Sequence, residues 1–198
     1  MERVVNTEAT SDRELVARCR AGEEGAFDEL VTRHQQRALN VAYQVTRDFE
    51  DAAEIAQDAF VNVYRNIGTF RGECEFTTWL HQIVVNLARN RRRWWHRRGR
   101  ETTISMDCPV ATAEGELVRE VAAATAAPDV EAVRAEYGRQ LSVMLGRLPV
   151  KFREVLVLRN VEDLSYEEMA MALRCSVGTV KSRLARARDQ LRKAMSEE

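Results

Sequence analysis

The sequence predicts an all-α fold in which two small helical domains are joined by a linker. Gly and Pro are scarce, with 9 and 3 among 198 residues, which favours long helices over a turn-rich sheet protein. Hydrophobic residues make up 45% of the chain and charged residues 31%, enough for a core. Apolar residues recur at helical spacing on either side of a segment without periodicity. We therefore expect domains at residues 1–100 and 132–198, with a flexible acidic linker at 101–131.

The N-terminal domain is predicted to contain four helices. The first begins at a capping box opened by Ser11, and the second follows a break at Gly22–Gly25. Asp48 can cap the third helix. A loop over residues 68–76 leads to a fourth helix that Thr77 can cap. Four helices with short connections predict a compact bundle.

The C-terminal domain is predicted to contain four more helices. Two of them span Ala132–Leu148 and Phe152–Asn160, and a third opens with a capping box at Ser165. A short turn then leads into a strongly basic helix that starts near Thr179 and ends near Met195. Two helices joined in this way are typical of a helix-turn-helix.

Charge is unevenly distributed along the chain, although the formal net charge is only −1. The stretch Arg89–Arg100 is rich in arginine and lacks acids, and Ser176–Met195 is also basic. Acidic residues predominate between them. Two basic blocks flanking an acidic segment predict local polyanion sites rather than a uniformly adhesive surface.

The basic helix carries side chains suited to reading DNA. Ser182 and Arg186 share one face, and arginine can make a bidentate contact to guanine. Lys181 and Arg183 flank that face and suit phosphates. Thr179 offers a hydroxyl and free backbone N–H groups, an expected anion site. The alternative is that this is an ordinary solvated basic face.

A second group of residues suits unpaired bases. Phe70, Arg71 and Gly72 lie in the loop before the fourth helix, and Trp79 lies near the start of that helix, ahead of its amides and arginines. Rings can stack on bases, amides can read their edges, and arginines can hold the backbone. The alternative is that Trp79 and the neighbouring Phe76 belong to the core.

A third group is a polar stripe on the predicted third helix, formed by Asp51, Glu54, Gln57 and Asp58. Such a stripe can bind a partner protein. It is equally typical of an ordinary exposed helix face, and acids near a helix start also stabilise the helix.

Other function classes find little support. The four cysteines are widely separated and the three histidines are scattered, so we expect no disulfide framework, metal site, cofactor or catalytic constellation. No leader peptide or membrane-length apolar run is recognised, which predicts a cytoplasmic protein without membrane insertion. An enzyme with a small-molecule substrate is therefore disfavoured. A helix-turn-helix repressor or activator of duplex DNA remains an alternative, although it leaves the loop and polar stripe unexplained.

Taken together, these motifs resemble the extracytoplasmic-function (group IV) sigma factors of the sigma-70 family of bacterial RNA polymerase. The region 2 likeness runs from Leu15-Val16 through Ala26-Phe27-Asp28-Glu29-Leu30, Ala53–Phe60 and Phe70-Arg71-Gly72 to Thr78-Trp79-Leu80 and Asn86. The region 4 likeness includes Leu164–Ala170 and Gly178–Arg188. The resemblance covers most of the chain and implies a promoter-specificity subunit that helps to open the duplex and has no catalytic activity.

The resemblance also implies roles for individual residues and partners. The polar stripe would bind the clamp of the largest polymerase subunit, and region 4 would bind the flap. The residues implied for the −10 element are Phe70, Arg71, Gly72, Trp79, Asn86, Asn90 and Arg93. Those implied for the −35 element are Arg159, Thr179, Lys181, Ser182, Arg183 and Arg186. An anti-sigma factor is the expected regulator.

Some positions depart from the family pattern. The family more often has Asp at the position of Glu54 and Glu at that of Asp58, which conserves charge. Ala185 presents only a methyl group, so it can meet a thymine methyl but cannot hydrogen-bond a base. The promoter sequence therefore does not follow from the resemblance.

Overall fold

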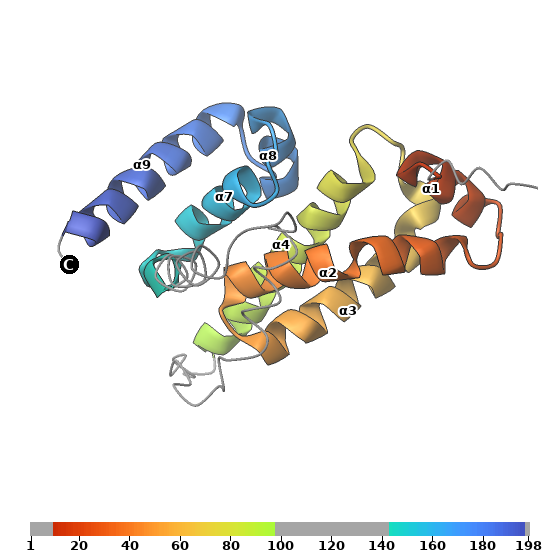
Figure 1. Cartoon of the computed structure of the whole chain (residues 1–198), viewed down its shortest axis with the longest axis horizontal. Coiled ribbons are helices and arrows are strands. Elements are labelled where there is room, and N and C mark those ends of the chain that lie inside the picture. The colour runs from red at the N-terminus through yellow and green to blue at the C-terminus, as the bar shows by residue number, and fades with distance from the viewer. Residues whose placement is uncertain (1–9, 98–142, 197–198) are drawn as a thin grey trace, which may run out of the picture.

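The computed structural model describes residues 10–97 and 143–196, which form two groups of helices (Figure 1). Neither described range contains a β-strand, so the predicted all-α fold class is confirmed. The predicted linker and most of the helix expected over Ala132–Leu148 lie outside the described residues.

In the N-terminal group, two helices begin at the capping residues that the sequence predicts. Its elements are α1 (Asp12–Arg20), α2 (Ala26–Thr46), α3 (Phe49–Asn66), the 3₁₀ turn η1 (Ile67–Thr69) and α4 (Phe76–Arg97). The predicted cap of α1 is confirmed, because Ser11 Oγ accepts a hydrogen bond from the Glu14 N–H at 3.3 Å. The cap of α3 is also confirmed, since Asp48 Oδ1 accepts from the Asp51 N–H at 2.8 Å.

The start of α4 differs from the prediction. The Glu75 carbonyl already accepts a helical hydrogen bond from the Trp79 N–H at 3.2 Å, so Thr77 lies within the first turn. Thr77 is therefore not the cap, and the prediction was wrong by two residues. Helix ends are commonly misplaced by this amount because a backbone carbonyl leaves no signature in the sequence.

The C-terminal group contains a helical segment at residues 143–147, α7 (Val150–Asn160), α8 (Tyr166–Leu173) and α9 (Val177–Ser196). The predicted capping box of α8 is present: Ser165 Oγ accepts from the Glu168 N–H at 3.2 Å, and Glu168 Oε2 accepts from the Ser165 N–H at 2.8 Å. The helix α7 begins directly after Pro149, two residues before the expected start. The turn between α8 and α9 ends the first helix with Arg174 in a left-handed conformation (φ +50°).

The core of the N-terminal group fixes the positions of α3 and α4 relative to each other. Helices α2, α3 and α4 pack on one another, and their buried faces combine alanine with larger aliphatic residues. The fully buried alanines Ala38, Ala42, Ala52 and Ala59 lie on α2 and α3, where small side chains permit close approach of the two helices. Functional side chains on the exposed faces of α3 and α4 are therefore positioned by a rigid scaffold.

The two groups are docked, with α7 and α8 packed against α2 and α4 (Figure 1). Buried polar groups cross this interface. The guanidinium of Arg153, only 3% exposed, donates to the Val45 carbonyl at the end of α2 at 2.8 Å. It also donates to the carbonyls of Leu145, Gly146 and Leu148 at 2.8 to 3.1 Å. The last carbonyls of α2 and of the 143–147 segment thus find a donor that the helices themselves lack.

Two carboxylates complete this interface. Glu154 of α7 accepts from Arg89 of α4 at both oxygens, at 2.8 and 2.5 Å. Glu162 lies between Arg37 of α2, which donates to it, and His81 of α4. Because buried charges are costly unless paired, this arrangement is specific for the docked state of the two groups.

Candidate nucleic-acid interface

The polar stripe on α3 divides into a paired end and an exposed end. Asp51 Oδ2 accepts from the Trp95 indole N–H at 3.1 Å, and Arg91 pairs with both Asp51 and Glu54. Gln57 and Asp58, one turn further on, are exposed. Glu54 is exposed as well, so Gln57 and Asp58 are the exposed part of the predicted stripe that lies outside the pairing with Arg91.

Asp51 is electrostatically held in place. Burial raises the pKa of its carboxyl group, while the hydrogen bond from Trp95 and the charge of Arg91 act in the opposite direction. Trp95 in turn packs edge-to-face on Trp94, with ring centroids 4.7 Å apart. The tryptophan pair in the arginine block thus anchors the end of α4 to the start of α3.

The loop before α4 presents an aromatic stack. Phe70 and Trp79 are stacked with centroids 4.6 Å apart and planes 19° apart, and both are half-buried. Phe76, which meets Trp79 at its edge, is 3% exposed and belongs to the core, as the alternative interpretation held. The accessible rings are therefore Phe70 and Trp79.

The backbone of this loop requires glycine at one position. Gly72 has φ +71°, in the left-handed region that other residues rarely adopt. Arg71 beside it is exposed, and its guanidinium is 3.9 Å from the Glu73 carboxylate. Burial and the charges of Glu73 and Glu75 raise the pKa of the Cys74 thiol, which keeps that side chain neutral.

Helix α4 brings the remaining predicted −10 residues onto one face. Trp79, Asn86, Asn90 and Arg93 are separated by seven, four and three residues, so they follow one another along the helix. Asn90 and Arg93 are exposed and Asn86 is half-buried. None of these three polar side chains has a hydrogen-bond partner within the described ranges. This face continues from the aromatic stack and offers unengaged amide and guanidinium groups beside it.

The α3 stripe and the α4 face are neighbours. Asp58 and Asn90 line one cavity of about 330 Å³, together with Arg91 and Trp94. The exposed end of the α3 stripe and the α4 face therefore border the same cavity.

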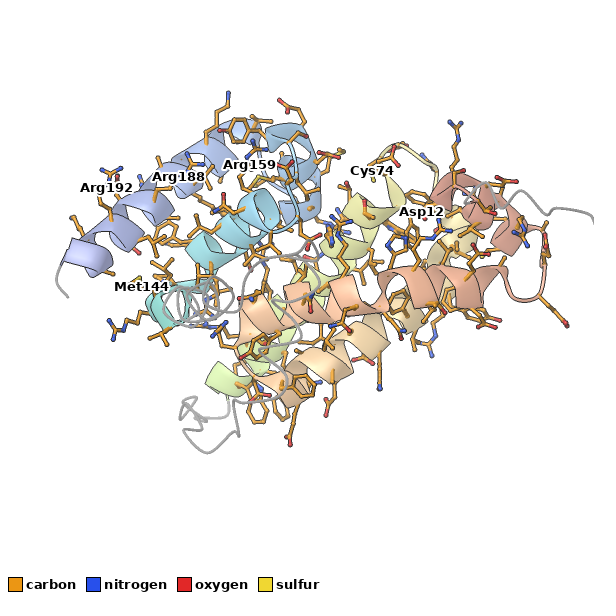
Figure 2. All side chains as sticks on the ribbon, in the orientation of Figure 1. Asp12, Cys74, Met144, Arg159, Arg188 and Arg192 are labelled. Atoms are coloured by element: carbon orange, nitrogen blue, oxygen red, sulfur yellow. The ribbon has the colours of Figure 1, made fainter. Side chains whose placement is uncertain are left out.

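The basic helix α9 is packed through Val180, Leu184 and Ala187, and exposed side chains lie on its other faces. Ser182 and Arg186 are exposed, whereas Arg183 is half-buried. Figure 2 shows Arg188 and Arg192 further along the same helix, and Arg159 on α7 beside it. The predicted −35 residues therefore lie in one group of helices.

One detail of the α9 prediction is wrong. The Thr179 N–H donates to Ser176 Oγ at 3.2 Å, and the two hydroxyls are 2.9 Å apart. Ser176 is thus the local cap, and Thr179 does not provide the free N–H and hydroxyl expected for an anion. Ser182 also donates to the Thr179 carbonyl, at 3.0 Å.

Tyr166, the first residue of α8, contacts two predicted DNA-binding side chains. The Arg159 guanidinium is 5.7 Å from the centroid of its ring and the Lys181 ammonium is 5.4 Å away. Arg159 also donates to the Leu164 carbonyl at 2.8 Å. Tyr166 therefore helps to orient both cations, and because Arg159 and Lys181 are distant from it along the chain, no local sequence pattern signals this contact.

No metal-binding cluster of three or more His, Cys, Asp or Glu side chains occurs in residues 10–97 and 143–196. Cys19, Cys74 and Cys175 are free thiols and half-buried, while Cys108 lies outside the described residues. No described helix is long and apolar enough to cross a membrane.

Comparison with known proteins gives two family matches. Residues 30–98 match sigma-70 region 2, and residues 138–191 match sigma-70, region 4. The chain is 33% identical to the RNA polymerase sigma-H factor of Pseudomonas aeruginosa over 184 residues, 93% of each chain. It is 32% identical to the ECF RNA polymerase sigma-E factor of Escherichia coli K12 over 189 residues, 93% of this chain and 94% of that one.

Solved structures share the fold. CnrH, in complex with the cytosolic domain of CnrY, has 26% identity and a TM-score of 0.66, covering 94% of this chain and 98% of that one. The sigma factor RpoE of Bartonella quintana, co-crystallised with the anti-sigma factor NepR, has 21% identity and a TM-score of 0.59. That match covers 86% of this chain and 96% of the Bartonella protein.

Proposed function

The chain belongs to the extracytoplasmic-function sigma factors of the sigma-70 family, and from this premise we propose how its surfaces divide the work of transcription initiation. Sigma factors are transcription initiation factors. The division proposed is core polymerase on α3, the −10 element on α4 and the preceding loop, and the −35 element on α9.

The observation that carries this division is the unbroken α4 face. A stacked aromatic pair, a left-handed glycine and a row of amide and guanidinium groups follow one another from the loop at residues 70–75 to Arg93. A base that leaves the duplex loses stacking and pairing, and needs aromatic surface and hydrogen-bond partners in return. This face offers both, which supports its assignment to the unpaired −10 strand.

The −35 assignment is supported by the helix-turn-helix of α8 and α9. Arg186 is exposed on α9 and suits a bidentate contact to guanine in the major groove. Arg159 and Lys181, held on either side of Tyr166, suit the phosphates that flank it. In this division Thr179 and Ser182 support the start of α9, and Arg183 supplies a further phosphate contact.

Core polymerase is assigned to Gln57 and Asp58, with Asp51 and Glu54 behind them. Gln57, Asp58 and Glu54 are exposed, Asp51 is half-buried, and Arg91 pairs with both Asp51 and Glu54. An exposed carboxylate beside an amide on a rigid helix can pair with basic residues of the polymerase clamp. Region 4 would contact the flap.

The docked arrangement of the two groups implies a step before initiation. The −10 and −35 elements are separated along a promoter, so α4 and α9 must move apart to reach both. We propose that the interface around Glu162 and Arg153 opens on core binding and that an anti-sigma factor favours the closed form. The Bartonella sigma factor of the same fold was solved with an anti-sigma factor. The chain would act in the cytoplasm, without catalytic activity of its own.

Run-off transcription tests this function. Core polymerase with the purified chain should produce discrete transcript starts from a genomic fragment pool, whereas core alone should not. The alternative of a duplex-binding repressor predicts tight binding to a duplex operator without polymerase, and no new starts. Starts that require the chain, mapped by sequencing, would also reveal the promoter motif.

A further inference from the structure

A basic cavity lies between the two docked groups of helices. It has a volume of about 490 Å³ and takes its walls from α4, α7, α9 and the turn after α8. The cationic residues that line it are Arg89, Arg92, Arg93, Lys151, Arg174 and Arg183. The carboxylate in the lining is Glu154. A cavity of this size lies within the usual range for a small-molecule site.

Glu154 does not neutralise the cavity. Its side chain is 1% exposed, and both of its oxygens are used by Arg89, which also donates to the Leu173 carbonyl at 3.3 Å. The Arg89–Glu154 pair therefore forms a part of the cavity wall that carries no net charge. The other five cations have no ion-pair partner among residues 10–97 and 143–196.

The pKa of Arg153, a buried neighbour of the cavity, reflects the positive potential of these cations. Burial, followed by the charges of Arg47 and Arg92, lowers the pKa of Arg153 to about 10. Arg47 and Arg92 thus place this guanidinium in a positive field, which the carboxylate of Glu154 opposes only in part. Such a field attracts anions into the cavity.

Backbone N–H groups at the start of α7 add to the preference of the cavity for anions. Val150 and Lys151 line the cavity and form the first turn of α7, which follows Pro149 without a side-chain cap. The first N–H groups of a helix have no partner within it, and the helix dipole favours an anion there. Guanidinium groups from three elements surround this turn, and guanidinium binds phosphate oxygens in a bidentate manner.

We propose that this cavity binds a small polyphosphate, inorganic or attached to a nucleoside, and that the bound anion holds the two groups of helices together. Several cations around one compact space match a ligand that carries several charges on a short chain. Duplex DNA does not fit into this volume without separating the two groups. Where the proposed function holds, the ligand also withdraws Arg93 and Arg183 from promoter DNA.

The first test is calorimetric titration of the full chain with inorganic tripolyphosphate and, separately, with ATP at constant ionic strength. Both should bind. Equal affinities would show that the phosphate chain is the recognised part, and tighter binding of ATP would show that the nucleoside contributes. Heat that sodium sulfate of the same ionic strength reproduces would overturn the proposal.

Substitutions inside and outside the cavity test where tripolyphosphate binds. Arg92→Gln with Arg174→Gln should weaken tripolyphosphate binding roughly a hundredfold, because two charge-assisted contacts are lost. Arg65→Gln with Arg188→Gln removes the same charge at exposed positions outside the cavity and should change the affinity by less than about twofold. Equal losses in the two double variants would show diffuse attraction rather than a site.

A third variant tests the role of docking. Glu162→Arg lies outside the cavity but places a cation against Arg37 and His81, so it should separate the groups and abolish tripolyphosphate binding although every lining residue is intact. Circular dichroism must show that its helices remain, and Glu162→Gln serves if they do not. Undiminished binding in a folded, separated variant would overturn the proposal.

The remaining alternative is that the cavity is a nucleic-acid site. A short single-stranded oligonucleotide that binds more tightly than tripolyphosphate, and is weakened by Arg92→Gln with Arg174→Gln, would establish that alternative instead. These measurements use the chain without polymerase or promoter. Their failure would therefore leave the proposed function in transcription initiation intact.

Discussion

Glu162 and His81 join the two groups of helices through a buried contact, with Glu162 Oε2 lying 3.1 Å from His81 Nε2. The histidine side chain is fully buried and that of Glu162 is 3% exposed. Arg37 of α2 completes the site from the other side. A buried carboxylate that meets a guanidinium and an imidazole of the other group of helices is stabilised only while all three are in place.

This contact predicts an acid-sensitive interface. Burial raises the pKa of Glu162, but the hydrogen bonds and charges of His81 and Arg37 outweigh it and hold the pKa below its ordinary value of 4.5. A carboxyl group with a lowered folded pKa stabilises the fold above the ordinary pKa. That contribution disappears as the pH falls through the lower, folded value. Glu162→Gln should therefore cost about 1–3 kcal/mol at pH 7 and progressively less below pH 4.5.

Urea unfolding of wild type and Glu162→Gln between pH 7 and pH 3 measures this difference. The exposed Glu167→Gln on α8 makes the same chemical change away from the interface, and it should leave the free energy of unfolding within about 0.5 kcal/mol at each pH. A constant difference between wild type and Glu162→Gln across the range would contradict the assigned pairing.

Local features of the fold were predictable from the sequence, whereas contacts between the groups were not. Caps at Ser11, Asp48 and Ser165 depend on residues three positions away, so their chemistry is visible in the sequence. The histidine at position 81 looked isolated, because its partner Glu162 is distant along the chain. Arg153 likewise finds its carbonyl partners only once the two groups are docked.

The candidate surfaces show the same division. Helical spacing alone places Asn86 and Asn90 on one face of α4, and the structure retains that face. Spacing could not show that Asp51 would accept a hydrogen bond from Trp95, since that contact depends on how α3 and α4 cross. The cap of the Thr179 N–H by Ser176 is, in contrast, a contact over three positions that the sequence could have indicated.

The accessible end of the α3 stripe predicts a defect in core binding. Gln57→Ala with Asp58→Lys should weaken binding to core polymerase roughly tenfold or more, because a reversed charge within an interface is strongly unfavourable. Both residues are exposed, so the free energy of unfolding should change by less than about 0.5 kcal/mol per substitution. Affinity is measured with labelled core, and stability with urea.

The matched control for this experiment is Gln35→Ala with Glu24→Lys, which makes the same chemical changes at exposed positions of α2 and the preceding turn. The control should bind core like wild type. Equal affinity of the test and control variants would remove core binding from this face of α3.

The α9 surface predicts two distinguishable DNA phenotypes in the holoenzyme. Arg186→Ala should cost about 1–3 kcal/mol and relax preference at one or two base pairs of the −35 element, as loss of a bidentate base contact does. Lys181→Ala should weaken binding to all sequences and flatten its salt dependence. Competition between specific and scrambled −35 duplexes over a salt series separates the two. Equal losses on both duplexes for both variants would contradict direct readout by Arg186.

The stack of Phe70 on Trp79 and the amides of α4 predict a defect in promoter opening. Phe70→Ala with Asn86→Ala removes a ring that can receive an unstacked base and an amide that can read it. Unstacking and unpairing a base costs a few kcal/mol, so opening should suffer more than initial binding, which α9 still supports. Permanganate footprinting of unpaired thymines measures opening, and gel shift on ice measures initial binding.

A template with a pre-melted bubble across the −10 element separates a role in opening from a role in folding. The bubble supplies the unpairing energy in advance, so the double variant should recover much of its activity there, although not its base selectivity. Phe49→Ala with Asn40→Ala removes a ring and an amide away from the α4 face and should open the paired promoter normally. If the Phe70 and Asn86 variant also melts the paired promoter normally, Phe70 serves only to pack against Trp79. The base-receiving surface must then lie elsewhere on the chain.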